Sequence, residues 1–409
     1  MHTPVLAVLA LLASDPAPSA PPLTLAEAVV IAQQTAEPSI EAFEARALAA
    51  ESRGRAADTR PDPVIAAGLA SIPATDLDIN REPMTQARVG LRQMFPRGDT
   101  RRLDREQQMA EARALRANGD RTERMIQQSV REAWLEMYYV DRATELTRAR
   151  LQAVRDLAEM ALSAYSTGRQ NSHDVTRIGL ESSMLEARLI DLERQREQGV
   201  ADLSRYLPSA AARRPLPPEL PVLPVLPVSE SVTERLIHHP EIMAHNARIE
   251  VHEAGVDLAR QAFRPAWALE AGYGVRGSRS DLASVGVSVQ VPLFDRTRQT
   301  EGVASARDLR HAAELERDAA LREFHRQFER ELAQLRRLQE SAEIYDTAVI
   351  PQAQETAAAV LLAYQEEQAD FAELIRSELA HLDAQLVLLR IRVDALKAQS
   401  RLLYLTGDF

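Results

Sequence analysis

A strictly alternating stretch, ASVGVSVQVPLFDRT (Ala283–Thr297), is the clearest feature of the hydrophobic pattern. Valine occupies every second position from Val285 to Val291, with serine, glycine or glutamine between. Because successive side chains of a strand point to opposite faces, this pattern predicts a strand with one apolar and one polar face. Together with this stretch, three further segments predict four strands: Asp62–Ile72, Thr85–Phe95, Ala266–Arg276 and Leu282–Val291.

Long helices account for most of the remaining chain. A pattern without proline begins at the N-cap candidates Asp99 and Thr100 and runs to about Ala164, which at 1.5 Å per residue gives a helix of roughly 100 Å. Its apolar positions form a narrow seam, which needs an equally long partner. The seam consists of Leu103, Ala110, Met125, Val130, Trp134, Met137, Leu146, Leu151, Val154 and Leu157.

A second long helix is predicted from Thr297 to Ile350, where Pro351 should kink or restart it. Returning helices, about Asp174–Tyr206 and Glu373–Tyr404, complete two antiparallel helical hairpins with turns near Gly168 and Gln368.

The two halves of the chain repeat each other. The segments from Glu37 and from His239 both open with x-Pro-x-Ile and reach an Arg-Pro pair, and AYSTGRQNSHDVTR from Ala164 matches AYQEEQADFAELIR from Ala363. Each half therefore reads helix, strand, strand, long helix, turn, helix, and repetition on this scale favours a structural role. The predicted organisation begins with a signal peptide and a Pro-rich N-terminus (1–22). The first repeat (23–207) contains a β-hairpin at about 62–95 and a helical hairpin at 98–207, and the second repeat (232–409) contains a β-hairpin at about 266–291 and a helical hairpin at 297–406. A Pro-rich linker (208–231), which is either disordered or an ordered crossing segment, joins the two repeats.

Composition excludes several classes of function. Aromatic residues make up only 4% of the chain, and 49 basic against 60 acidic residues give a net charge of -11, with no basic stripe for nucleic acid. Cysteine is absent, so disulfides and thiolate metal sites are excluded. No nucleophile, base and orienting group recur at a catalytic spacing, so we expect no enzyme, no cofactor and no metal site. An apolar run at Val5–Ala13 followed by small residues and proline resembles an export signal.

The predicted strands are close to the 9–11 residues that cross a bilayer at a tilt. Four strands cannot close a barrel, and open sheet edges are costly in lipid, so the edges should pair with other copies of the chain. Three copies would supply 12 strands around a water-filled lumen. The valines of the alternating strand would then face lipid, whereas Ser284, Ser288 and Gln290 would face the lumen. A soluble alternative is a small sheet that caps a helical bundle.

Other motifs do not point to a site. Gly272–Gly277 matches the dinucleotide fingerprint G-x-G-x-x-G, but a strand follows it where a helix is needed. His245 and His252 lie seven residues apart, too far to share a metal on one helix, and we interpret them, with His238 and His239 just before, as solvated. Arginines at the predicted strand–helix junctions would either bind phosphate of the inner leaflet or form ordinary solvated helix surface. They are Arg97, Arg101, Arg102, Arg105, Arg296 and Arg298.

The duplicated plan, from about Leu23 to Gly407, resembles the TolC family of trimeric outer-membrane efflux ducts. The run RPDPVIAAGLASIPATDLDINREPMTQARVGLRQMFPRGDTR (Arg60–Arg101) resembles the first β-hairpin of the branch often paired with heavy-metal efflux pumps. VIPQAQ from Val349 resembles the proline-bearing long helix of the family. The motifs that carry the likeness of the hairpin are Pro61-Asp62-Pro63, Glu82-Pro83-Met84-Thr85 and Gln93-Met94-Phe95-Pro96.

The resemblance implies a mainly α fold with a small β part. Three chains would form a 12-stranded β-barrel in the outer membrane, continued by a long α-helical coiled-coil barrel in the periplasm. The implied partners are two further copies in a homotrimer, a periplasmic adaptor (membrane fusion) protein, an inner-membrane pump of the RND type and outer-membrane lipids, without nucleic acid. The implied function is a passive duct for substrates that include heavy-metal cations.

The resemblance also implies site residues. The turns of the helical hairpins would dock the adaptor at the periplasmic tip, through Tyr165, Ser166, Thr167, Gly168, Tyr364, Gln365, Glu366 and Glu367. Asp174 and Glu373 would narrow the pore, although as helix-start residues they would also suit the helix dipole with no gating role. Glu367 stands where the family usually has glycine, and Arg376 stands where some members have a second acid, which leaves the tightness of the gate open.

Two other classes of protein share some of these features. A periplasmic coiled-coil adaptor would also have long helical hairpins, but it needs no duplicated two-faced strands. A soluble helical pore-former that inserts on demand does not explain the duplicated halves. An outer-membrane duct accounts for both features.

Overall fold

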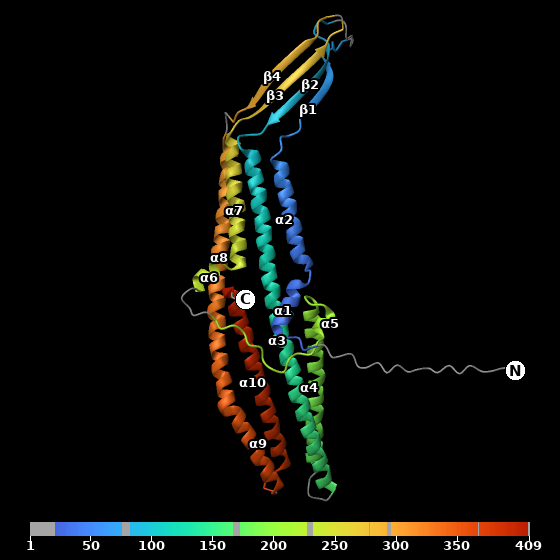
Figure 1. Ribbon diagram of the computed structural model, residues 1–409, viewed down its shortest axis with the longest axis vertical. Helices are drawn as coiled ribbons and strands as arrows, with labels where there is room; N and C mark the ends of the chain where they lie inside the picture. The colour runs from blue at the N-terminus through green and yellow to red at the C-terminus, as the bar shows by residue number, and fades with distance from the viewer. Residues whose placement is uncertain are drawn as a thin grey trace, which may run out of the picture. The chain divides into compact units, whose positions relative to one another are not determined.

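The computed structural model describes residues 21–75, 82–166, 172–226, 232–277, 279–292, 296–366 and 368–407 (Figure 1). The predicted signal segment lies almost entirely outside these residues. The chain forms two compact units, which we describe separately. Unit 1 comprises Met1–Thr35, Ile126–Leu226 and Glu331–Leu402, and unit 2 comprises Ala36–Met125, Pro227–Arg330 and Leu403–Phe409. Each unit therefore contains parts of both sequence repeats.

Unit 2 carries an antiparallel four-stranded sheet in the order β1-β2-β3-β4 (Figure 1). The strands are β1 (Val64–Ala70), β2 (Gln86–Phe95), β3 (Ala266–Val275) and β4 (Leu282–Gln290). All four predicted strands are confirmed, but β1 begins two residues later than predicted. Pro61 and Pro63 lack the N–H that a ladder needs, so pairing starts only at Val64. The strands β1 and β4 each have one neighbour in this sheet, which leaves two open edges.

The helices of unit 2 are α2 (Pro38–Ala57), α6 (Val232–Ile237), α7 (Pro240–Arg260) with the 3-10 turn η2 (Gln261–Phe263), and the first parts of α3 (Thr100–Ser166) and α8 (Thr297–Ile344). Small side chains hold α2 and α7 against α3. Ala47 and Ala50 of α2 pack on Ala112, and Val251 of α7 packs on Ala110 and Ala114. Arginines of α3 flank these contacts, since Arg116 pairs with Glu44 at 3.0 Å and Arg113 pairs with Glu250 at 2.8 Å. Close approach is therefore possible without large apolar residues.

Unit 1 contains α1 (Leu25–Gln34), α4 (Ser172–Ser204), α5 (Ser209–Ala212), α9 (Ile350–Gln365), most of α10 (Phe371–Thr406) and the later parts of α3 and α8. Its core is centred on Trp134 of α3, which is fully buried and donates its Nε1–H to the carbonyl of Leu23 at 3.0 Å. The neighbouring Tyr138 donates its hydroxyl to the carbonyl of Pro218 at 2.7 Å. These two side chains tie the segment before α1 and the Pro-rich segment to α3.

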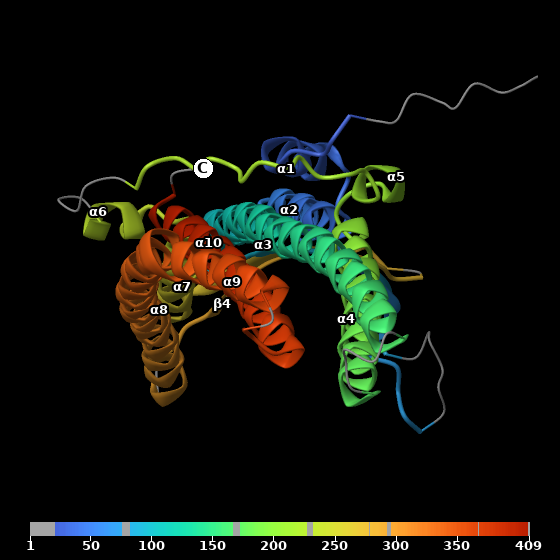
Figure 2. The same cartoon turned by 90° about the horizontal axis from the view of Figure 1, so that it is seen from below.

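A second apolar cluster of unit 1 joins α3, α4 and α10, three helices that Figure 2 shows from below. Leucine, isoleucine and valine side chains from the three helices meet at regular intervals, as in a coiled coil. Val154 of α3, Ile178 of α4 and Leu374 of α10 are among its fully buried members. The helix α4 returns beside α3 as predicted, and α10 packs on this pair.

The second long helix changes type before its proline. The α-helix α8 ends at Ile344, and a π-helical turn, Tyr345–Val349, leads into α9. Pro351 cannot donate a backbone hydrogen bond to the preceding turn, which loosens the helix at this point. Asp346 in the π-helical turn accepts hydrogen bonds from Arg392 of α10 at 2.6 Å to both carboxylate oxygens. The predicted restart at Pro351 is thus confirmed as a local change of winding.

Two predictions from the pattern are wrong. The pattern places Met125 in the apolar seam of α3, but it is 46% exposed. The spacing of the histidines predicts that His239 is solvated, but it is only 2% exposed. It precedes α7 as the N-cap residue, its Nδ1 accepts the backbone N–H of Glu241 at 3.2 Å, and its ring contacts Phe324 and Tyr404. Helix capping and aromatic packing bury this histidine. Its spacing from the other histidines in the sequence does not indicate either interaction.

The burial of His239 predicts a pH-dependent stability. Burial lowers the pKa of His239 to about 4, below the ordinary value near 6.5 in the unfolded chain. Its neutral form therefore stabilises unit 2 fully above pH 6.5, and this stability is lost as the pH falls towards 4, by roughly 3 kcal/mol at most.

Thermal unfolding measured from pH 7 to pH 4 tests this expectation. His239→Asn retains an N-cap acceptor but cannot be protonated, so its stability should fall less over the same range. An identical pH dependence in both proteins would contradict the assignment.

Candidate functional site

One face of the sheet is apolar across all four strands, apart from Gln93 of β2. The register places Val287 beside Leu269, Val89 beside Tyr273 and Ile65 beside Leu91, and cross-strand partners share a face. The large side chains of this face are 42–80% exposed: Ile65, Leu69, Val89, Leu91, Trp267, Leu269, Tyr273, Val275, Val285, Val287 and Val289. An apolar surface of this extent is rare on a soluble monomer and indicates contact with lipid or protein.

The opposite face is polar. Arg92 of β2 lies beside Glu270 of β3 in the register and forms an ion pair with it at 3.2 Å. The predicted lumen-facing residues Ser284, Ser288 and Gln290 lie opposite Gly272, Ala268 and Ala266, respectively, on this same face. Placing arginine or glutamate on a lipid-facing surface costs free energy. The position of Arg92 and Glu270 therefore distinguishes the polar face from the apolar face more clearly than the serines do. The lumen-facing role itself remains a prediction.

Two glycines of the rejected dinucleotide motif, Gly272 and Gly274, belong to this polar face. Gly272 and Gly274 lie within β3, and a side chain at either position would collide with Ser284 or Gln86, respectively. Their small size leaves room for cross-strand polar side chains and has no connection with a nucleotide.

The predicted docking residues lie at the ends of the two helical hairpins. Tyr165 and Ser166 close α3 and are exposed, whereas Thr167 and Gly168 lie outside the described residues. Tyr364 and Gln365 end α9. The centre of the Tyr364 ring lies 5.5 Å from the centre of the buried Phe371 ring. Glu366 follows as the exposed C-cap residue, and Glu367 lies outside the described residues. These positions agree with hairpin ends, and their docking role stays a prediction.

The two predicted pore residues are not both described. Glu373 is exposed in the first turn of α10, while the side chain of Asp174 in α4 lies outside the described residues. The constriction therefore remains a prediction.

Asp370 caps the start of α10, three residues before the helix start predicted at Glu373. Its Oδ1 accepts the backbone N–H of Glu373 at 2.6 Å. An N-cap aspartate three residues before a glutamate is a known helix-start pattern, and this signal was available at Asp370 and Glu373.

Asp370→Ala should destabilise the first turn of α10 by about 1 kcal/mol, because a helix N–H loses its acceptor. Hydrogen exchange of residues 371–375 should then accelerate about fivefold, whereas Asp370→Asn, which keeps an acceptor, should stay close to the wild type. Equal exchange in all three proteins would show that the cap does not hold this end of the helix.

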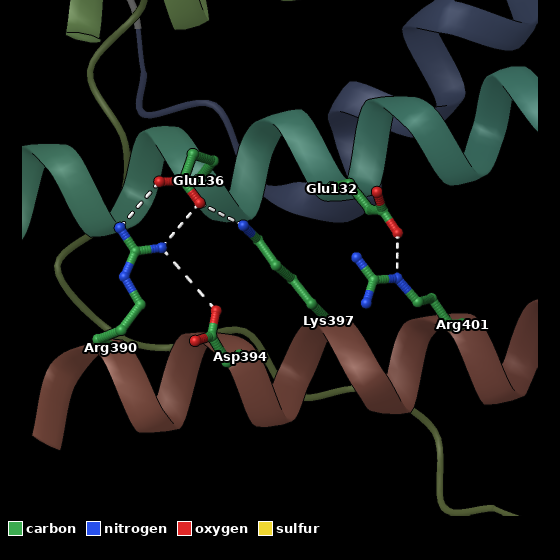
Figure 3. A network of polar contacts seen from close by, with 6 residues as sticks. All are labelled: Glu132, Glu136, Arg390, Asp394, Lys397 and Arg401. Carbon is green, nitrogen blue, oxygen red and sulfur yellow. Dashed lines mark hydrogen bonds and ion pairs between the residues drawn. The ribbon is translucent and has the colours of Figure 1, made fainter. Parts of the chain in front are cut away.

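An ion-pair network joins α3 to α10 in unit 1 (Figure 3). Glu136 accepts two hydrogen bonds from Arg390 at 2.9 Å and a third from Lys397, and Arg401 pairs with Glu132 at 2.6 Å. Burial alone raises the pKa of Glu136, but the bonds to Arg390 and Lys397 outweigh this effect and lower its pKa to about 2. Glu136 therefore stays ionised at physiological pH and keeps α10 in one register on α3.

Among the described residues, none of the helices is both long and apolar enough to cross a membrane.

Comparison with known proteins is informative at the level of family and fold. Residues 232–408 match the family model described as outer membrane efflux protein. The structure of the outer membrane protein VceC from Vibrio cholerae is 18% identical, with 94% of this chain and 96% of VceC covered and a TM-score of 0.78. A membrane protein from Pseudomonas aeruginosa is 16% identical, with 93% and 90% covered and a TM-score of 0.81. No curated protein sequence matches the chain significantly.

A third structure, of CusC, is 14% identical, with 93% of this chain and 91% of CusC covered and a TM-score of 0.78. The likeness to each of these structures extends over nearly the whole chain, whereas the sequence match covers the second repeat. The structural likeness and the sequence match both agree with the two-faced sheet and the paired helical hairpins described above. Residues 232–408 therefore match the outer membrane efflux protein family, and the whole chain has the TolC-like fold of the channel structures that it resembles.

Proposed function

We propose that the protein is the outer-membrane channel of a tripartite efflux system. The exposed apolar face of the sheet is the observation that carries this proposal, because it extends across the two inner strands as well as the edges, as a face covered by lipid does. Three copies would pair through the open edges of β1 and β4 and close a 12-stranded barrel. A periplasmic adaptor has no use for such a sheet, which favours the channel over that alternative.

The channel is a passive duct in this proposal. Residues 1–22 direct export, and the repeats 23–207 and 232–409 each supply one β-hairpin and one helical hairpin. The helices extend into the periplasm, where the tips around Tyr165 and Tyr364 meet an adaptor, and an inner-membrane pump of the RND type delivers the cargo. Asp174 and Glu373 attract cations at the entrance.

Heavy-metal cations are the cargo that we propose. Structures below a quarter identity carry the fold and not the cargo, so this part rests on the resemblance of Arg60–Arg101 to the first hairpin of the heavy-metal branch. The proposals for the channel and for the cargo can fail separately.

Growth of a deletion strain on copper, silver, zinc, cobalt and cadmium salts, beside a panel of drugs and detergents, tests both parts. Selective sensitivity to metals, restored by the intact gene but not by a gene that lacks residues 163–175, is the expected result. Drug sensitivity alone would remove the metal cargo and keep the channel. Equal amounts of trimer in the outer membrane must be shown for both genes, because a misassembled variant would imitate a docking defect.

A further inference from the structure

Arginines gather where the strands of unit 2 meet its helices, and they differ in their partners. Arg102 and Arg105 form ion pairs, with Glu106 at 2.7 Å and Asp58 at 3.0 Å, respectively. Several others have no carboxylate within ion-pair distance in the described part of the chain. They are Arg60, Arg97, Arg101, Arg264, Arg296 and Arg298.

Two of these arginines have structural roles. Arg97 donates to the carbonyl of Ala262 at 3.2 Å, and Arg101 donates to the carbonyl of Asp58 at 3.2 Å. They fasten the corner between strands and helices. Arg60, which is exposed, makes no such bond, and its guanidinium carbon lies 6.0 Å from the centre of the Phe95 ring.

Phe95 forms the edge of the apolar face beneath this guanidinium. Its ring stacks on that of Trp267, with centres 3.9 Å apart and planes 8° apart, and the two residues are partners in the register of β2 and β3. Trp267 is 42% exposed, and Phe263 is exposed nearby in the chain. Arg60 therefore lies over an aromatic pair at the helix-side end of the apolar face.

This arrangement suits the interface between hydrocarbon and headgroups. Tryptophan and other aromatic residues concentrate at this depth, and an arginine above them can reach the phosphate with its planar fork of donors. Arg92 on the opposite face is neutralised by Glu270 at 3.2 Å, whereas the Arg60 guanidinium lies near the ring of Phe95 on the apolar side.

We propose that Arg60, with the stacked Phe95 and Trp267, binds the headgroup phosphate of an anionic phospholipid in the inner leaflet. The inference rests on the proposed outer-membrane location. The acyl chains of the lipid lie against Trp267 and Leu269, which a free phosphate ion would leave uncovered. A second copy of the chain does not compete for this site, because Phe95 and Trp267 belong to the inner strands and copies would join at β1 and β4.

The two tryptophans of the chain allow a direct test. Trp134 is fully buried and Trp267 is exposed, so Trp134→Phe leaves Trp267 as the only fluorescent tryptophan. The variant is reconstituted into phosphatidylcholine vesicles with a small fraction of phosphatidylglycerol brominated near the headgroup end of its chains. Brominated phosphatidylcholine at the same fraction provides the reference for unselective contact.

The anionic bromolipid should quench Trp267 as though it were enriched about fivefold near the protein, the factor expected for one arginine at an anionic surface. Arg60→Gln should abolish the enrichment, whereas Arg102→Gln, which removes an arginine already paired with Glu106, should preserve it. Inorganic phosphate at equal concentration should not displace the lipid.

Equal quenching by the two lipids, or an enrichment that survives Arg60→Gln, would overturn the phospholipid site while leaving the barrel in place. Displacement by inorganic phosphate would assign the site to free anions and overturn it too. Failure of every bromolipid to quench Trp267 would place this face outside the bilayer and reject the outer-membrane proposal itself. Native mass spectrometry of the wild-type trimer beside Arg60→Gln, counting retained phosphatidylglycerol, tests the site without relying on the Trp134→Phe variant.

Discussion

Replacing Val287 by arginine should prevent the protein from accumulating as a trimer in the outer membrane. Val287 lies in the middle of β4, on the apolar face, beside Leu269 of β3. An arginine facing lipid near the bilayer midplane costs about 2–4 kcal/mol, and each copy in a trimer would bear this cost. The amount of trimer is measured in outer-membrane fractions by electrophoresis without heating.

Ser288→Arg is the matched control for this prediction. Ser288 is the next residue of the same strand, but it lies opposite Ala268, on the polar face that also carries Arg92 and Glu270. The added charge would meet water there, so trimer should accumulate at nearly the wild-type level. Similar losses in both variants would mean that β4 does not separate lipid from water, and would contradict the assignment of the faces.

Trp134→Ala should have the largest effect on the stability of unit 1. The side chain is fully buried, stacks near Tyr138 and bonds to the carbonyl of Leu23. Truncating a buried tryptophan to alanine typically costs about 3–5 kcal/mol. The segment before α1 would lose its anchor, so limited proteolysis should cut near residues 21–34 much faster, and the melting temperature should fall.

Trp134→Phe separates packing from the lost hydrogen bond. The phenyl ring keeps most of the buried contacts, and the missing Nε1–H should cost about 1 kcal/mol. A Trp134→Ala protein as stable as Trp134→Phe would show that α1 is held by other contacts.

The strands could be predicted because their signal is local. Alternation in Leu282–Val291 determines which side chains share a face, and the prolines at positions 61, 63 and 292 limit the strand ends. The helical hairpins were equally clear, since their apolar seams and turns repeat in both halves. These features depend on neighbours within a few residues, which one sequence displays directly.

Contacts between distant segments could not be predicted in the same way. Nothing in the sequence pairs Glu136 with Arg390, 254 residues away, because dozens of arginines compete for each acid. The pairing of Phe95 with Trp267 likewise depends on the join between the two β-hairpins. His239 contacts Phe324 and Tyr404, which are far from it in the sequence. Its burial therefore could not be predicted from neighbouring residues.

The network around Glu136 contains a side chain of a type that occurs once in the sequence. Lys397 is the only lysine among 409 residues, and its largely buried ammonium is bound to Glu136 between α10 and α3 (Figure 3). An amine-selective reagent or a lysine-specific protease has this one internal target, which is shielded as long as the two helices stay together. Modification of this one lysine side chain would therefore show when α10 separates from α3.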